Sequence, residues 1–137
     1  MILPEEILAN RLHELGLGIY DEDGADGNIY LDNIPDKLLS DGEYIISVYK
    51  SGSFTRNIAL LGGSINPIYN IYVKSKKLLD ASRMAHTIAN TISEDSYSKN
   101  DYIVHQTFIF SEPVRLVIDE KGDYTFSFQV IQNIEYL

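Results

Sequence analysis

The sequence has no cysteine, few basic residues and no long hydrophobic run. Without cysteine the chain forms neither a disulfide framework nor a thiolate zinc site, and it has no cysteine nucleophile. The N-terminal segment MILPEEILANRLHEL carries acids where a secretory signal peptide carries a basic region. We therefore expect a soluble protein without a signal peptide, a membrane span or a membrane partner.

Basic residues are scarce mainly because one part of the chain nearly lacks them. The 137 residues include 11 Lys and Arg against 20 Asp and Glu, which gives a net charge of -9. The excess of acids falls within residues 1–43, where Arg11 and Lys37 are the only bases. Such a section repels phosphate, and no dense basic stripe follows it, so we expect no specific nucleic-acid binding.

The length and composition predict one folded domain over residues 1–137. Hydrophobic residues make up 45% of the chain and charged residues 23%, as in ordinary globular proteins. Two segments have the hydrophobic period of an amphipathic helix, residues 5–17 and 78–92. Gly16 or Gly18 is expected to end the first helix, and Ser75 is expected to cap the second.

Extended segments dominate the rest of the chain. A cluster of glycine and acidic residues over 20–28 predicts a hairpin or loop. β-Branched and aromatic residues predict strands over 29–31, 43–50, 68–74, 102–110, 114–118 and 124–134. The alternation of apolar and polar residues over 124–130 predicts one apolar and one polar sheet face. The predicted fold is α+β, with a mostly antiparallel sheet covered on one face by the N-terminal and central helices. Residues 51–67 are predicted to form a long projecting loop between two central strands.

No pattern typical of an enzyme or a metal site is present. The three histidines, His13, His86 and His105, lack metal-ligand spacing, and Gly62-Gly63 lacks the residues of a phosphate-binding loop. The acids over 21–32 suggest calcium, but they fail the EF-hand pattern. We expect no enzymatic activity, no metal and no cofactor, although polar residues that assemble only in three dimensions could form a small active site.

The order of these elements resembles the tail terminator and minor capsid proteins of long-tailed bacteriophages, also called tail completion or head-to-tail joining proteins. The resemblance covers nearly the whole chain and rests on element order and spacing. It is carried by a short helix (PEEILANRLHEL), two strands (EYIISVYK and IYNIYVK) around a glycine-bearing loop, an alanine-rich helix (LLDASRMAHTIANTI), and the closing segment SEPVRLVIDEKGDYTFSFQVIQNI. Two departures are Lys74, where many relatives have arginine, and the long acidic segment over 21–41.

The resemblance implies a structural virion protein. Such a protein forms a ring of six copies at the head-proximal end of the tail tube, stops tail polymerisation and joins the tail to the head connector. Its partners would be its own copies, the tail tube protein and the connector or stopper protein, with DNA passing through the ring. It would reside in the virion, and in the host cytoplasm during assembly. The alternatives are another phage neck or baseplate adaptor, or a non-catalytic protein-interaction module.

Three groups of residues are candidate contacts under this interpretation. For each group, an ordinary solvated surface is the competing explanation. The loop between the central strands would contact the tube or a neighbouring copy through Phe54, Arg56 and Asn57. A basic junction would grip an acidic neighbour through Lys74, Lys76 and Lys77. An acidic group would face the lumen or a basic partner through Asp21, Glu22, Asp23 and Asp26.

Overall fold

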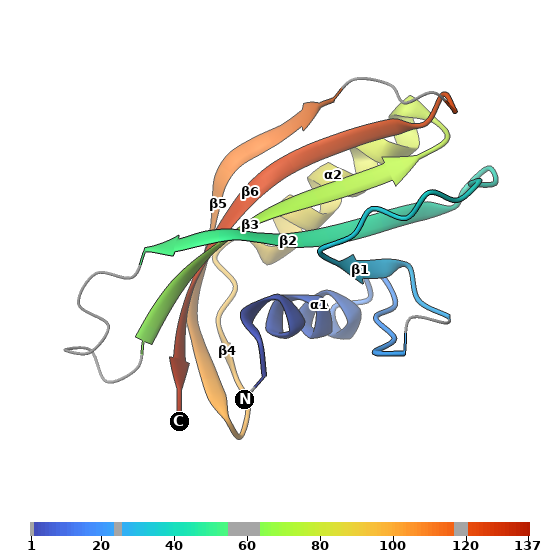
Figure 1. Ribbon diagram of the computed structural model, residues 1–137. Coiled ribbons are helices and arrows are strands. Elements are labelled where there is room, and N and C mark those ends of the chain that lie inside the picture. Colours follow the sequence, from blue (N-terminus) through green and yellow to red (C-terminus); the bar gives the residue numbers. More distant parts are fainter. Residues whose placement is uncertain (1, 24–25, 55–63, 117–120) are drawn as a thin grey trace.

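Two helices lie against one face of a curved six-stranded sheet in the computed structural model (Figure 1). The structure describes residues 2–23, 26–54, 64–116 and 121–137. The strand order is β1-β2-β3-β6-β5-β4, and all neighbours are antiparallel except β1 and β2. The predicted α+β fold is confirmed. The elements are α1 (Pro4–Glu14), β1 (Ile29–Leu31), β2 (Tyr44–Phe54), β3 (Ser64–Ser75), α2 (Leu78–Ile92), β4 (Tyr97–Ser98), β5 (Tyr102–Arg115) and β6 (Tyr124–Tyr136).

Helix α1 is shorter than the predicted helix at its C-terminal end. Its first turn is capped by Glu6, whose carboxylate accepts a hydrogen bond from the Leu3 N–H at 2.9 Å. Gly16 follows the last turn with a φ of 75°, a left-handed conformation that glycine adopts without steric cost. The helix therefore ends at Glu14, and Gly16 is the stop that the sequence offered.

Helix α2 occupies the predicted residues, but its predicted cap is wrong. Ser75 is the last residue of β3, and its hydroxyl donates to the Glu43 carbonyl at 3.1 Å instead of capping the helix. The N-cap position is Lys77, which makes no side-chain capping bond. Neither helix of the described residues is long and apolar enough to cross a membrane.

The strands are longer than their propensities indicate. Strands β2 and β3 pair up to Phe54 and Asn66, so the predicted loop over 51–67 is wrong at both of its ends. Strand β5 runs without interruption through the predicted break after residue 110 and absorbs extra residues as bulges. The segment over 29–31 pairs with β2 in parallel, which excludes a hairpin between them.

The core lies between the two helices and the sheet. In β6 the side chains of Phe126, Phe128 and Val130 are buried, while the intervening residues are half-buried on the other face, as the alternation predicts. Tyr69 on β3 is fully buried, and its hydroxyl donates to the Pro4 carbonyl at 3.0 Å. This bond joins the sheet to the start of α1.

Buried tyrosines predict a loss of stability in alkaline solution. Burial raises the pKa of Tyr69 well above its ordinary value of about 10, and it also raises the pKa of Tyr97 and Tyr102. Because these phenols ionise more readily in the unfolded chain, their contribution is complete below about pH 10 and declines as the pH rises further. We expect the free energy of unfolding, measured by urea denaturation, to fall steeply above about pH 10.

The Tyr69→Phe variant is the control for this prediction. It should be less stable at neutral pH by about 1 kcal/mol, because the hydrogen bond to Pro4 is lost. Its stability should then decline less steeply with pH than that of the parent chain. Equal slopes in the two proteins would show that Tyr69 does not drive the alkaline transition.

Candidate functional site

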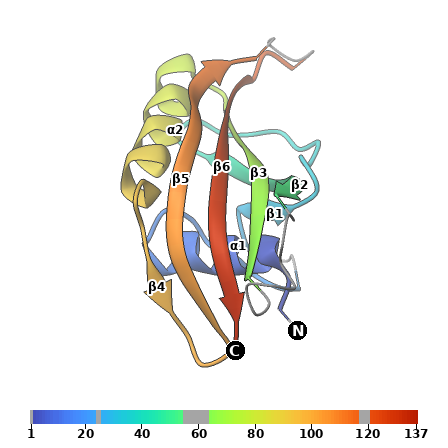
Figure 2. The ribbon, with the colours of Figure 1, turned by 90° about the vertical axis from the view of Figure 1, so that its left-hand side faces the viewer.

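The sheet face that points away from the helices has an unusual composition. Strands β2, β3, β6 and β5 pair in cross-strand rows on this side. Figure 2 shows β3, β6 and β5 side by side. We call this surface the neutral face and define it by the outward residues of four rows. Its members, which leave out the buried Ser47, are Tyr49, Gly52, Asn66, Ile68, Asn70, Tyr72, Gln106, Phe108, Ser111, Val114, Ser127, Gln129, Ile131 and Asn133.

None of these residues is charged, although charged residues make up 23% of the chain. Charges return only beyond the two ends of the rows. At one end the next outward residue of β3 is Lys74, and at the other end the next outward residue of β6 is Glu135. The Glu135 carboxylate oxygen lies 2.7 Å from the Nε2 atom of His105, which is within hydrogen-bond distance. A solvated sheet face ordinarily carries charges, so their absence requires another explanation.

An apolar row crosses the middle of the neutral face. Ile131 pairs with Ile68 on one side and with Phe108 on the other. Phe108 is 49% exposed and Val114 on the same strand is 58% exposed, while the two isoleucines are half-buried. Absence of charge combined with exposed aromatic and branched side chains is the composition found at the centre of protein–protein interfaces.

Two tyrosines stand beside this row. The rings of Tyr49 and Tyr72 meet edge to face, with centroids 5.3 Å apart. Amide and hydroxyl groups of Asn70, Gln129 and Ser127 surround them, and each of these groups can donate and accept hydrogen bonds. Four strands about 4.8 Å apart and four rows that span about 20 Å make a surface of roughly 400 Å² in projection, enough for one side of a small interface.

The predicted basic junction does not form one surface. Lys74 is only 5% exposed and lies 3.7 Å from Asp123, which is 4% exposed. The expectation that Lys74 grips a partner is therefore wrong, because its ammonium group is committed inside the domain. Lys76 and Lys77 are exposed and lie 4.0 and 3.8 Å from the Asp41 carboxylate. Surface pairs of this kind contribute little to stability and leave both lysines accessible.

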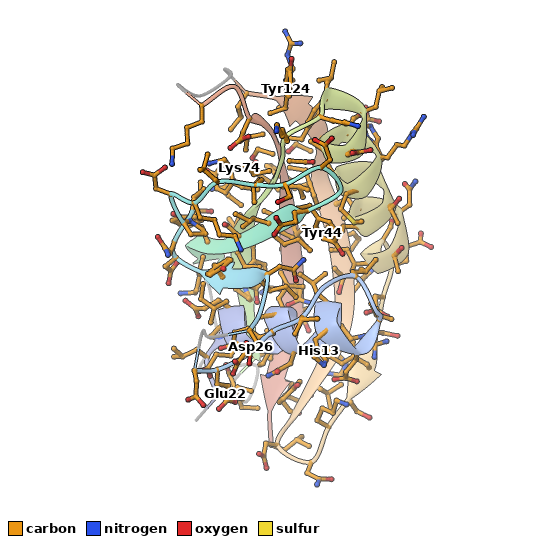
Figure 3. All side chains as sticks on the ribbon, turned by 90° about the vertical axis from the view of Figure 1, so that its right-hand side faces the viewer. His13, Glu22, Asp26, Tyr44, Lys74 and Tyr124 are labelled. Carbon is orange, nitrogen blue, oxygen red and sulfur yellow. The ribbon has the colours of Figure 1, made fainter. Side chains whose placement is uncertain are left out.

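The predicted acidic group lies on the connection between α1 and β1. Glu22 and Asp26 lie beside α1 in Figure 3, far from Lys74 at the other end of the domain. The Asp21 carboxylate accepts the backbone N–H groups of Asp23 and Asp26 at 3.0 and 3.1 Å, so it shapes the turn. Glu22, Asp23 and Asp26 are exposed, and their orientation toward a lumen or a basic partner stays a prediction.

The predicted loop contacts lie mostly outside the described residues. The Phe54 backbone pairs with Asn66 at the end of β2. Arg56 and Asn57 lie outside the described residues, and their role stays a prediction. Of these three candidates, the structure therefore places only the Phe54 backbone, at the end of β2.

The histidines that the sequence offered are each engaged locally. The His13 ring accepts the Tyr20 N–H at 3.0 Å, and the His86 ring lies 2.8 Å from the Ser82 carbonyl within α2. In the described part of the chain, no three His, Asp or Glu side chains are grouped so that they could hold a metal ion. The Asn28 side-chain oxygen, which lies among the acids that suggested calcium, accepts the Ile19 N–H at 2.7 Å.

Sequence reasoning identified the polar side of β6 but missed the neutral face as a unit. The signal was present in two segments, INPIYNIY on β3 and TFSFQVIQN on β6, where the outward residues are uncharged. Their alignment into rows depends on the bulges of β2 and β5, which strand propensity does not locate. No family model matches the sequence, and no curated protein matches it.

Proposed function

We propose that this protein is a non-catalytic structural subunit of a bacteriophage tail. In this proposal, copies of the chain form a ring at the head-proximal end of the tail tube, stop its growth and join it to the head connector. The neutral face is the observation that carries the proposal, because it is suited to contact another protein. The element order, which carries the resemblance to tail terminator proteins, agrees with it.

The energetics of the neutral face support a contact function. The chain covers one face of its sheet with its own helices and leaves the apolar row of Ile68, Ile131 and Phe108 on the other. Keeping such side chains in water forgoes roughly 25 cal/mol for each Å² that a partner could bury. A partner protein would recover this energy, and the surrounding amide and hydroxyl groups would supply the hydrogen bonds of its rim.

The charge distribution is compatible with a passage for DNA. The exposed acids Glu22, Asp23 and Asp26 would repel the phosphate backbone if they faced the lumen. A negative wall lets DNA slide without binding it, whereas a basic wall would hold it. This orientation is part of the proposal. A substitution of Asp26 tests it better than one of Asp21, because the Asp21 carboxylate also holds the turn by accepting the Asp26 N–H.

Assembly on tail tubes is the experiment that tests this function. Native mass spectrometry over a wide range of concentrations, with negative-stain images, would show whether the purified protein forms closed rings. The protein would then be added to purified tail tubes that lack a terminator and sedimented with them. We expect binding at one end of each tube and an arrest of further growth. Tubes that keep growing with no bound protein would contradict the proposal.

A further inference from the structure

A second surface of low charge lies on the opposite side of the domain. Helix α2 buries its alanine and isoleucine side against the sheet and turns its other side to solvent. Among the exposed residues of this outer side only Arg83 carries a fixed charge, and the half-buried Asp80 lies one turn before it. We call it the α2 surface and define it by the exposed residues Leu79, Arg83, His86, Thr87, Asn90 and Thr91.

The α2 surface and the neutral face point in opposite directions. The helix packs on the core face of the sheet, and the neutral face is the reverse of the same sheet (Figures 2 and 3). The 15 residues of α2 make a helix about 22 Å long. The four rows of the neutral face span about 20 Å along the strands, so the helix and the face match in length.

We infer that the α2 surface of one copy packs on the neutral face of the next copy. This inference rests on the proposed function, in which the neutral face is a contact surface, and it names the occupant of that surface as a second copy of the chain. Each copy then uses two different surfaces, which makes the contact heterologous. Contacts of this kind close into a ring or continue as an open chain, according to the rotation between neighbours.

The charges of the chain favour this pairing. The acids of residues 1–43 give the protein its net charge of -9, so most surfaces of two copies repel each other. Neither the neutral face nor the C-terminal half of α2 has an acidic side chain. In Figure 3 the acidic residues Glu22 and Asp26 lie beside α1, away from α2. Asp80 and Glu112 border the α2 surface, beside Arg83 and His86, so a contact through these two surfaces places these two acids at its edge and leaves the acids near α1 outside it.

The single cation of the α2 surface has a suitable acceptor on the neutral face. No ion pair of Arg83 is found in the described part of the chain, and its side chain is exposed. Tyr49 and Tyr72 present ring faces and hydroxyl groups on the opposite surface. A guanidinium group stacks on such rings without a carboxylate, so Arg83 needs no acidic partner in the contact.

A contact between two neutral faces would bury less of the exposed apolar surface of each copy than the contact between a neutral face and an α2 surface. Such a two-fold contact would bury both apolar rows but leave both α2 surfaces, including Leu79, in water. It would also stop at two copies. The head-to-tail contact buries one neutral face and one α2 surface for every copy that is added.

Site-specific cross-linking tests the inference, because the natural chain has no cysteine. Gln129→Cys places one thiol at the centre of the neutral face, and Thr87→Cys places one on the α2 surface. Asn100→Cys, in the exposed connection between β4 and β5, is the control. Each variant would be treated alone and in pairs with a short bismaleimide at high protein concentration, and the products would be resolved by denaturing electrophoresis.

The expected result is efficient cross-linking only in the mixture of Gln129→Cys with Thr87→Cys. A chain carrying both substitutions should give a ladder of covalent oligomers. Efficient dimers of Gln129→Cys alone would establish a two-fold contact instead and overturn the inference. Mixed cross-linking no stronger than that of Asn100→Cys with Thr87→Cys would also overturn it. Specific mixed cross-links in a protein that does not bind tail tubes would instead contradict the proposed tail function and leave the contact standing.

Discussion

Replacement of Asp123 by alanine should lower the free energy of unfolding by about 3–5 kcal/mol. Asp123 and Lys74 lie 3.7 Å apart, and both are at most 5% exposed. Removal of the carboxylate deprives the buried Lys74 ammonium group of the opposite charge that lies 3.7 Å from it. Chemical denaturation at neutral pH measures this loss, and we expect the midpoint to shift without a change in the slope of the transition.

The reciprocal and double variants separate the ion pair from other effects. Lys74→Met should also be strongly destabilising, because it leaves the Asp123 carboxylate buried. The variant with both Lys74→Met and Asp123→Ala should lose less stability than the two single losses together, since the cost of burying both charges is then removed. Asp41→Asn is the matched surface control and should cost less than about 1 kcal/mol. A loss of similar size for Asp123→Ala and Asp41→Asn would contradict the argument.

The helices and the alternating strands could be predicted because their patterns are local. The apolar period over 78–92 predicted both ends of α2, and alternation over 124–130 predicted which side of β6 is buried. The ends of β2 and β3 could not be predicted in this way. Residues near them are glycine, serine, asparagine and proline, which have low strand propensity but are held in the ladder by the opposite strand.

The site was harder to predict than the fold because it depends on contacts between distant residues. In the sequence Lys74 resembles Lys76 and Lys77, and all three lie at the end of the same predicted strand or directly after it. Lys74 alone is buried, and Asp123, the residue directly before β6, lies beside it. The neutral face depends in the same way on register, since a shift of one residue in a strand would turn its outward residues inward.

Replacement of Gln129 by lysine should abolish self-association while leaving the fold intact. Gln129 lies near the centre of the neutral face, and its half-buried side chain points away from the core. In the proposed contact the new ammonium group would be desolvated near Arg83 of the neighbouring copy, which should weaken association by roughly 3 kcal/mol, or on the order of 100-fold. Net charge alone would give the opposite result, because an added positive charge reduces the repulsion between copies that each carry a charge of -9.

Asn100→Lys adds the same charge at an exposed position outside both surfaces and is the matched control. Analytical ultracentrifugation of both variants and the parent chain compares their association at equal ionic strength, and denaturation curves confirm equal stability. Association should be lost in Gln129→Lys and be retained or strengthened in Asn100→Lys. Because Gln129→Glu would place an acid near the same arginine, it should associate more strongly than Gln129→Lys despite its greater net charge. Equal association of all these proteins would remove the neutral face from the contact.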